Sequence, residues 1–261
     1  MIFITETVDL DTPTGKMRTH VYRPVAPGRY PGLVLFSEIF QVTAPISRTA
    51  AMLAGHGFVV AAPEIFHDLE PAGCMIPYDD EGAQRGNAHK VGRPIQAYDD
   101  DTRAVIDWLK GNPYCTGRIG SMGICVGGHL NYRACMNTEV LAGVSFYATD
   151  IHKGSLGSAG DNSLARTGEI KGELCMFWGQ QDPHVPTEGR RMVYNALVDN
   201  GVNFTWHEFN GQHAFLRDEG HRYDPELARV CMGIAIDLFR RKLNEGDLPI
   251  VDTSGPAESR H

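Results

Sequence analysis

Short apolar runs alternate with helix-like segments along most of the chain, and this alternation constrains the fold more than any other feature. The apolar runs lie at residues 32–37, 57–62, 118–124, 142–147, 173–178 and 203–209. Apolar residues recur at helical spacing in segments 45–55, 97–110, 127–136, 188–200 and 225–243. Runs this apolar are typical of strands buried on both faces, and strands that alternate with helices form a largely parallel sheet. We therefore predict an α/β fold with helices on both faces of the sheet.

Two further strands are predicted near the N-terminus, at residues 2–10 and 17–23. A turn-forming Asp-Thr-Pro-Thr-Gly cluster separates them, which indicates an antiparallel hairpin. The sheet should then hold about eight strands within a single domain spanning residues 1–243. The tail, residues 244–261, has little apolar content, and we expect it to be at least partly flexible.

Two long polar segments, residues 66–94 and 152–168, interrupt the alternation. Both are rich in glycine and aspartate. Connections of this length usually act as lids or binding loops, so we predict loops at both places.

Composition excludes several classes of protein. The formal net charge of -8 opposes nucleic-acid binding, and no apolar stretch approaches the roughly 20 residues of a membrane-spanning helix. No export signal is evident, and the six cysteines are scattered without CxxC spacing, so we expect reduced thiols in a cytoplasmic protein. Because HExxH and paired CxxC spacings are also missing, we expect neither a metal nor another cofactor.

Residues 123–128, Gly-Ile-Cys-Val-Gly-Gly, carry the strongest chemical signal. They follow an apolar run and precede a helical segment, as the nucleophile elbow of an α/β-hydrolase does, but with cysteine in place of serine. The glycines permit a sharp turn that holds the nucleophile in a strained conformation. A small buried thiol beside a tight turn is the structural alternative. We predict that Cys125 is a nucleophile.

A hydrolase of this topology places an acid and then a histidine after later strands. Asp182 follows the run at 173–178, and His213 follows the run at 203–209. His213 would accept the thiol proton, and Asp182 would orient the imidazole. His184 is the alternative base, but its place in the chain order fits less well.

The same topology calls for two backbone donors that stabilise an oxyanion. One is the N–H of Val126, directly after the nucleophile. The other follows the first parallel strand, and we assign it to Ile39.

Together these residues resemble the dienelactone hydrolases, also called carboxymethylenebutenolidases. The likeness runs from the first hairpin to the last helical segment, and it rests on Cys125, Asp182 and residues 37–40, 85–90 and 213–217. The resemblance implies hydrolysis of a lactone or ester, a small molecule that can carry a carboxylate, through a thioacyl-enzyme.

The resemblance also implies roles for three charged residues. Glu38 would contact the resting thiol, and Arg85 and Arg217 would hold the substrate carboxylate, a task that suits the two-pronged guanidinium group. His89 and Gly92 stand where the family usually carries aromatic residues, which indicates a wider or differently lined pocket.

Two other functions remain open at this point. A general carboxylesterase or thioesterase could use the same scaffold. A non-catalytic binding or redox-sensing protein could keep Cys125 as a reactive thiol, although it would not need Asp182 and His213. Turnover of activated esters, as opposed to simple alkylation of Cys125, distinguishes these alternatives.

Overall fold

The structure is a computed structural model that describes residues 1–244. The flexible tail predicted from the sequence lies outside the described residues, apart from Asn244. Among residues 1–244, no helix has both the length and the apolar character needed to cross a bilayer.

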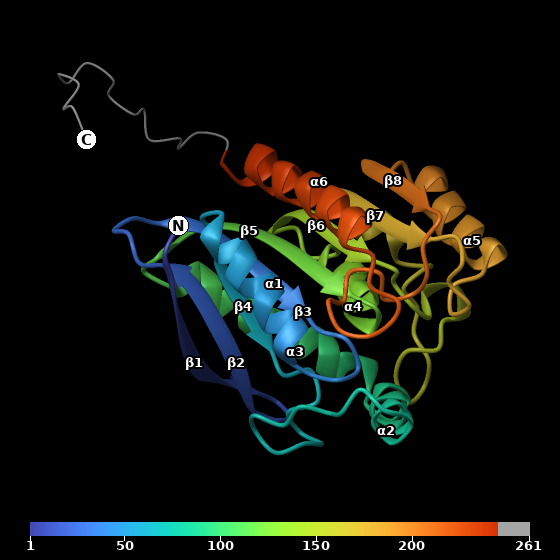
Figure 1. The fold of residues 1–261 in the computed structure, drawn as a ribbon, viewed down its shortest axis with the longest axis horizontal. Helices are drawn as coiled ribbons and strands as arrows, with labels where there is room; N and C mark the ends of the chain where they lie inside the picture. Colours follow the sequence, from blue (N-terminus) through green and yellow to red (C-terminus); the bar gives the residue numbers. More distant parts are fainter. Residues whose placement is uncertain (245–261) are drawn as a thin grey trace.

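One eight-stranded sheet forms the centre of the fold, in the order β1-β2-β4-β3-β5-β6-β7-β8 (Figure 1). Its strands are β1 (Phe3–Thr12), β2 (Gly15–Pro24), β3 (Tyr30–Phe36), β4 (Val59–Pro63), β5 (Cys115–Ile124), β6 (Val140–Phe146), β7 (Glu173–Gly179) and β8 (Phe204–Phe209). β1 and β2 form the predicted antiparallel hairpin, β2 pairs antiparallel with β4, and the remaining pairs are parallel. The predicted largely parallel sheet is confirmed.

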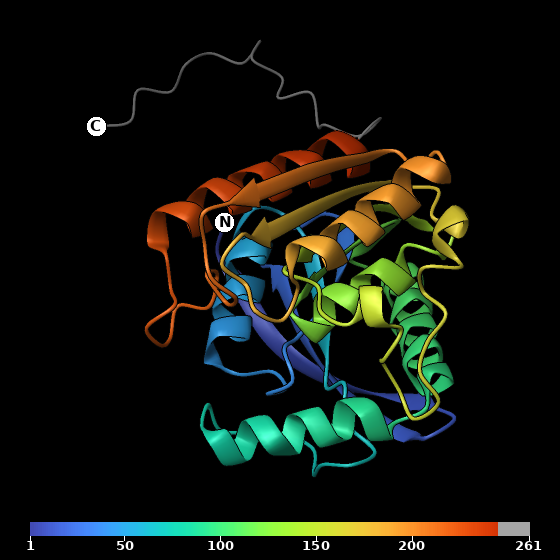
Figure 2. The same cartoon turned by 90° about the vertical axis from the view of Figure 1, so that its right-hand side faces the viewer.

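Helices cover both faces of this sheet, as predicted (Figures 1 and 2). α1 (Ala44–Gly55) and α6 (Pro225–Leu243) pack on one face, whereas α3 (Ile95–Gly111), α4 (Val126–Ala134) and α5 (Thr187–Asp199) pack on the other. In β3, Leu33 and Leu35 contribute to one core and Val34 and Phe36 to the other. Both faces of a strand are therefore buried, which is why the parallel strands have nearly continuous apolar sequences.

Helix α2 (Asp80–Gly92) corrects the prediction of a loop across residues 66–94. Its sequence has no apolar face, and its buried residues are Gly82 and Gly86, so hydrophobic periodicity gives no signal for it. Local polar signals do support a helix: the side chain of Asp79 accepts a hydrogen bond from the Gly82 N–H at 2.7 Å, and acidic residues in the first turn and basic residues in the last match the helix dipole. In Figure 2, α2 lies apart from the helices that pack on the sheet.

The second long segment, residues 152–168, is irregular as predicted, apart from the ends of two short 3₁₀ turns, Ile151–Lys153 and Thr167–Glu169. It is anchored to α4 by buried side chains, with His129 Nε2 lying 2.7 Å from Ser163 Oγ and Arg133 donating to the same oxygen at 3.0 Å. These contacts tie the segment to the helix that begins at the elbow.

Candidate active site

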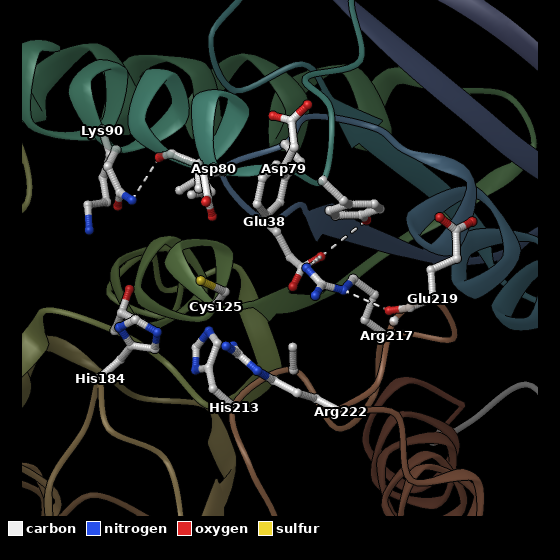
Figure 3. Close-up of a pocket in the computed structure, with 18 of the residues that line it drawn as sticks. Glu38, Asp79, Asp80, Lys90, Cys125, His184, His213, Arg217, Glu219 and Arg222 are labelled. Carbon is white, nitrogen blue, oxygen red and sulfur yellow. Dashed lines mark hydrogen bonds and ion pairs between the residues drawn. The ribbon is translucent and has the colours of Figure 1, made fainter.

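A cavity of about 650 Å³ lies at the carboxyl ends of the central strands (Figure 3). Loops after several strands contribute to it. Cys125 follows β5, His184 follows β7, His213 follows β8, and Glu38 and Ile39 follow β3. This is the edge of an open parallel sheet where ligands usually bind. The cavity therefore brings together most of the residues singled out by the sequence.

Cys125 sits at the sharp turn predicted for the elbow. Its backbone has φ 62° and ψ -119°, a conformation that non-glycine residues rarely adopt. The turn depends on its glycines, because a Cβ added at Gly123 would lie 1.8 Å from the carbonyl oxygen of Gly127, and one added at Gly127 would lie 2.4 Å from the oxygen of Phe36. α4 begins at Val126, so the positive end of its dipole lies at the thiol.

Asp182 and His213 form a buried hydrogen-bonded pair behind the cavity. Nδ1 of His213 lies 2.7 Å from Oδ2 of Asp182. The other carboxylate oxygen accepts the backbone N–H of His184 at 2.8 Å, which fixes the orientation of Asp182. Burial alone would raise the pKa of Asp182, but the bond to His213 holds it below its usual value.

Besides its bond to Asp182, His213 interacts with Cys125. Burial opposes protonation of His213, but the charge of a Cys125 thiolate and the bond to Asp182 outweigh it and raise the pKa of His213 to about 10. Figure 3 shows Cys125 beside the His213 ring, on the side of the cavity. The imidazole of His213 is therefore flanked by the Cys125 thiol and the Asp182 carboxylate.

His184, the alternative base, contacts His213 but occupies a different position. Its ring meets the His213 ring edge-on, with centroids 4.6 Å apart, and it also lines the cavity. Asp182 receives only the backbone N–H of His184, whereas it bonds the imidazole of His213. Burial and the charge of His213 lower the pKa of His184, so the ring is neutral near pH 7.

The two candidate oxyanion donors come from the loop after β3 and from the start of α4. Ile39 lines the cavity, and Val126 is the first residue of α4. Within residues 1–244, neither backbone N–H has a hydrogen-bond partner in the protein. The Ile39 residue lines the cavity, whereas Val126 is buried directly after the thiol.

Glu38 has different partners from those that the resemblance implies. Its buried carboxylate accepts the Tyr78 hydroxyl at 3.3 Å and lies 3.8 Å from the Arg217 guanidinium. In the described part of the chain, its hydrogen-bond and ion-pair partners do not include the Cys125 thiol. Burial raises the pKa of Glu38, although Arg217 and His213 act in the opposite direction.

The two candidate substrate-binding arginines differ in position. Arg217 lines the cavity and stacks on Tyr78, with its guanidinium carbon 4.4 Å from the ring centre. Arg85, in contrast, forms a two-pronged ion pair with Glu70, its side chain is 47% exposed, and it is not among the residues lining the cavity. The structure therefore places Arg217, but not Arg85, at the cavity.

The orientation of α2 determines where the Arg85 side chain points. Ala83, Asn87 and Lys90 recur at helical spacing and face the cavity, whereas Arg85 projects from another side of the helix. The sequence analysis missed three basic residues that line the cavity, namely Lys90, Lys153 and Arg222. A helix over 80–92 would have revealed Lys90. Lys153 ends a short 3₁₀ turn and Arg222 lies in an irregular segment, and neither has a sequence signal.

Residues 1–244 contain no group of three or more His, Cys, Asp and Glu side chains arranged to hold a metal ion. All six cysteines are free thiols.

Comparison with known proteins identifies the family. The profile of the dienelactone hydrolase family matches residues 17–243. A Saccharomyces cerevisiae protein named as a carboxymethylenebutenolidase is 39% identical, with 98% of this chain and 99% of that protein covered, and a carboxymethylenebutenolidase of Pseudomonas sp. strain P51 is 26% identical over 91% and 96%.

Solved structures agree on the fold. A structure described as a dienelactone hydrolase from Klebsiella pneumoniae superposes with a TM-score of 0.82 at 19% identity, covering 92% of this chain and all 100% of its own. An esterase structure from Pyrococcus furiosus superposes with a TM-score of 0.67 at 15% identity, covering 92% and 93%. The predicted α/β-hydrolase fold is thus confirmed, and the chain is a hydrolase that belongs to the dienelactone hydrolase family.

Proposed function

We propose that this enzyme cleaves a lactone or carboxylic ester through a thioacyl intermediate on Cys125, with His213 as base and Asp182 as its orienting partner. One observation carries the proposal: a thiol on a strained turn shares a cavity with an imidazole whose far nitrogen is bonded to a buried carboxylate. This is the arrangement of nucleophile, base and orienting acid used in acyl transfer.

The chemistry follows in two balanced steps. The Cys125 thiolate attacks the carbonyl carbon, and the oxyanion that forms accepts hydrogen bonds from the N–H groups of Ile39 and Val126. His213 then gives its proton to the departing alkoxide, and a thioester remains on Cys125. Neutral His213 next takes a proton from water as the water attacks the thioester, which releases the carboxylic acid and returns the proton to the thiolate–imidazolium pair.

Arg217 is the proposed contact for a substrate carboxylate. Arg217 lines the cavity, its Nε donates to the Glu219 carbonyl at 3.1 Å, and its guanidinium lies 3.8 Å from the Glu38 carboxylate. An anionic substrate would compete with Glu38 for this charge and leave the Glu38 carboxylate free to move toward the thiol. Such a shift would couple substrate binding to activation of the nucleophile.

Trapping the intermediate tests the nucleophile directly. Acid quenching during turnover of p-nitrophenyl acetate should leave an acetyl group on the peptide that contains Cys125, because acylation of the thiolate precedes hydrolysis of the thioester. Peptide mass spectrometry measures the adduct, and neutral hydroxylamine should remove it, as expected of a thioester. An adduct on another residue, or turnover without any adduct, would contradict the assignment.

Arg217→Ala should impair acidic substrates selectively. Loss of a charge-assisted hydrogen bond costs about 1.5–3 kcal/mol, which is roughly tenfold to more than a hundredfold in kcat/KM. The measurement compares two aryl esters that differ only in a free carboxylate at the end of the acyl chain.

Arg85→Ala is the matched control, since Arg85 is held by Glu70 outside the cavity. It should leave the preference between the two esters unchanged. Equal losses of kcat/KM on both esters in Arg217→Ala would favour a general carboxylesterase or thioesterase. A cavity of about 650 Å³ has room for the neutral substrates of such an enzyme.

A further inference from the structure

Helix α2 has no apolar face. Polar groups near its C-terminal end hold it to the body of the protein, since Lys90 pairs with Asp150 at 2.8 Å and its carbonyl accepts the Gly157 N–H at 3.2 Å, but its buried residues are glycines. Only Gly82 and Gly86 are buried in it. Gly82 packs against Pro77 in the segment that leads into the helix, so its contact is local. Gly86, in contrast, contacts a part of the chain that is far away in the sequence.

That contact is with the backbone of Ile39. A Cβ added at Gly86 would lie 2.4 Å from the carbonyl oxygen of Ile39, 2.9 Å from its Cβ and 3.2 Å from its carbonyl carbon. The first distance is far below van der Waals contact, and its partner is backbone that cannot rotate away. Any larger side chain at position 86 must therefore displace either α2 or the Ile39 peptide.

The segment that precedes α2 fixes the residues on both sides of Ile39. The Tyr78 hydroxyl donates to Glu38, and the Ile76 N–H donates to the Phe40 carbonyl at 3.1 Å. The rings of Phe40 and Tyr78 also meet edge-on at 4.6 Å. Gly86 adds a contact at the residue between them, so residues 76–86 hold Ile39 from one side.

A second glycine holds the same loop from the opposite side. A Cβ at Gly127, in the first turn of α4, would lie 2.4 Å from the carbonyl oxygen of Phe36 and 2.5 Å from that of Ser37. The chain leaving β3 therefore passes between the start of α4, which carries the Val126 N–H, and helix α2. Figure 3 shows α2 along the wall of the cavity that carries Asp80 and Lys90.

We propose that Gly86 is a positioning residue that lets α2 close against Ile39 and so sets the Ile39 N–H at the oxyanion site. This inference rests on the proposed function, because it needs an oxyanion to stabilise. Gly86 touches no substrate and acts only through the peptide that it contacts. Its absent side chain determines how far apart the Ile39 and Val126 donors lie.

Gly86→Ala tests the inference, with Gly92→Ala as the matched control in the same helix. Gly92 does not line the cavity in the described part of the chain, and a Cβ there would meet nothing within 4 Å. Both substitutions favour the helical backbone. We expect Gly86→Ala to lower kcat for p-nitrophenyl acetate on the order of tenfold to a hundredfold, as misplacement of an oxyanion donor does, with less change in KM. Gly92→Ala should match wild type.

The rate at which iodoacetamide alkylates Cys125 distinguishes a misplaced oxyanion donor from a general structural defect. A general defect would change this rate, whereas a misplaced donor would not. Displacement at carbon builds no oxyanion, so Gly86→Ala should alkylate at the wild-type rate while hydrolysing slowly. A kcat equal to that of Gly92→Ala would overturn the inference, as would parallel losses of alkylation, hydrolysis and thermal stability. Acyl trapping on wild-type Cys125 separates these outcomes from failure of the proposed function, because it does not depend on position 86.

Discussion

Cys125→Ala is expected to lower kcat for ester hydrolysis by about 10⁴-fold or more, as removal of the nucleophile does in other triads. The thiol would supply the bond-forming atom, and no other side chain at the elbow could replace it. Because Cys125 lies at the cavity surface rather than in the core, the variant should keep its fold. Steady-state kinetics with an aryl ester, together with Tm, measure both effects.

Cys74→Ala is the control for the loss of a partly exposed thiol. Cys74 bonds Glu70 outside the cavity, so its removal should leave kcat unchanged. If Cys125→Ala retained activity within threefold of wild type, the triad would be wrong. If Cys125→Ala kept full activity and no acyl adduct formed on the wild-type thiol, Cys125 would instead have a binding or redox role.

His213→Ala should lose nearly as much activity, about 10⁴-fold in kcat, because triad members act as a unit. His184→Ala is the matched control. Its ring packs on His213 but has no bond to Asp182, so its loss should cost less than about tenfold. The double variant Cys125→Ala/His213→Ala should be no slower than either single variant. A dead His184→Ala beside an active His213→Ala would reverse the assignment of the base.

The same His213→Ala variant should change how alkylation of Cys125 depends on pH. With its pKa raised to about 10, His213 stays protonated through neutral pH, and its charge supports a thiolate there. This support is present at pH 6 and is lost as the pH rises through about 10. The ratio of wild-type to variant alkylation rates should therefore be largest near pH 6 and shrink toward pH 10, and a ratio independent of pH would contradict the ion pair.

Much of the fold could be predicted because its signals are local. Apolar runs buried on both faces identify the parallel strands, and their alternation with helical segments determines the layers. The predicted ends of α6 agree with the structure at Pro225–Leu243, and its capping residue Asp224 accepts the Leu227 N–H at 2.9 Å. The elbow glycines likewise indicate the turn at Cys125, because a larger residue at position 123 or 127 would collide with backbone atoms.

The order of the candidate site residues was also readable from the sequence. In a parallel sheet, the loops after successive strands meet at one edge, so residues 125, 182 and 213 converge if their strands are placed correctly. The bond between Asp182 and His213 at 2.7 Å agrees with this reasoning.

Only the tertiary structure decided what surrounds these residues. Helix α2 has a cap and charged ends in its sequence but no apolar pattern, and the contact of Gly86 with Ile39 leaves no sequence signal, so the orientation of the helix could not be predicted. That orientation turns Arg85 toward Glu70 and Lys90 toward the cavity. Glu38 has Tyr78 and Arg217 as partners because distant segments bring them to its carboxylate. The sequence by itself determined the elements with their own periodicity or caps, whereas the direction of each charged side chain depended on contacts between segments far apart in the chain.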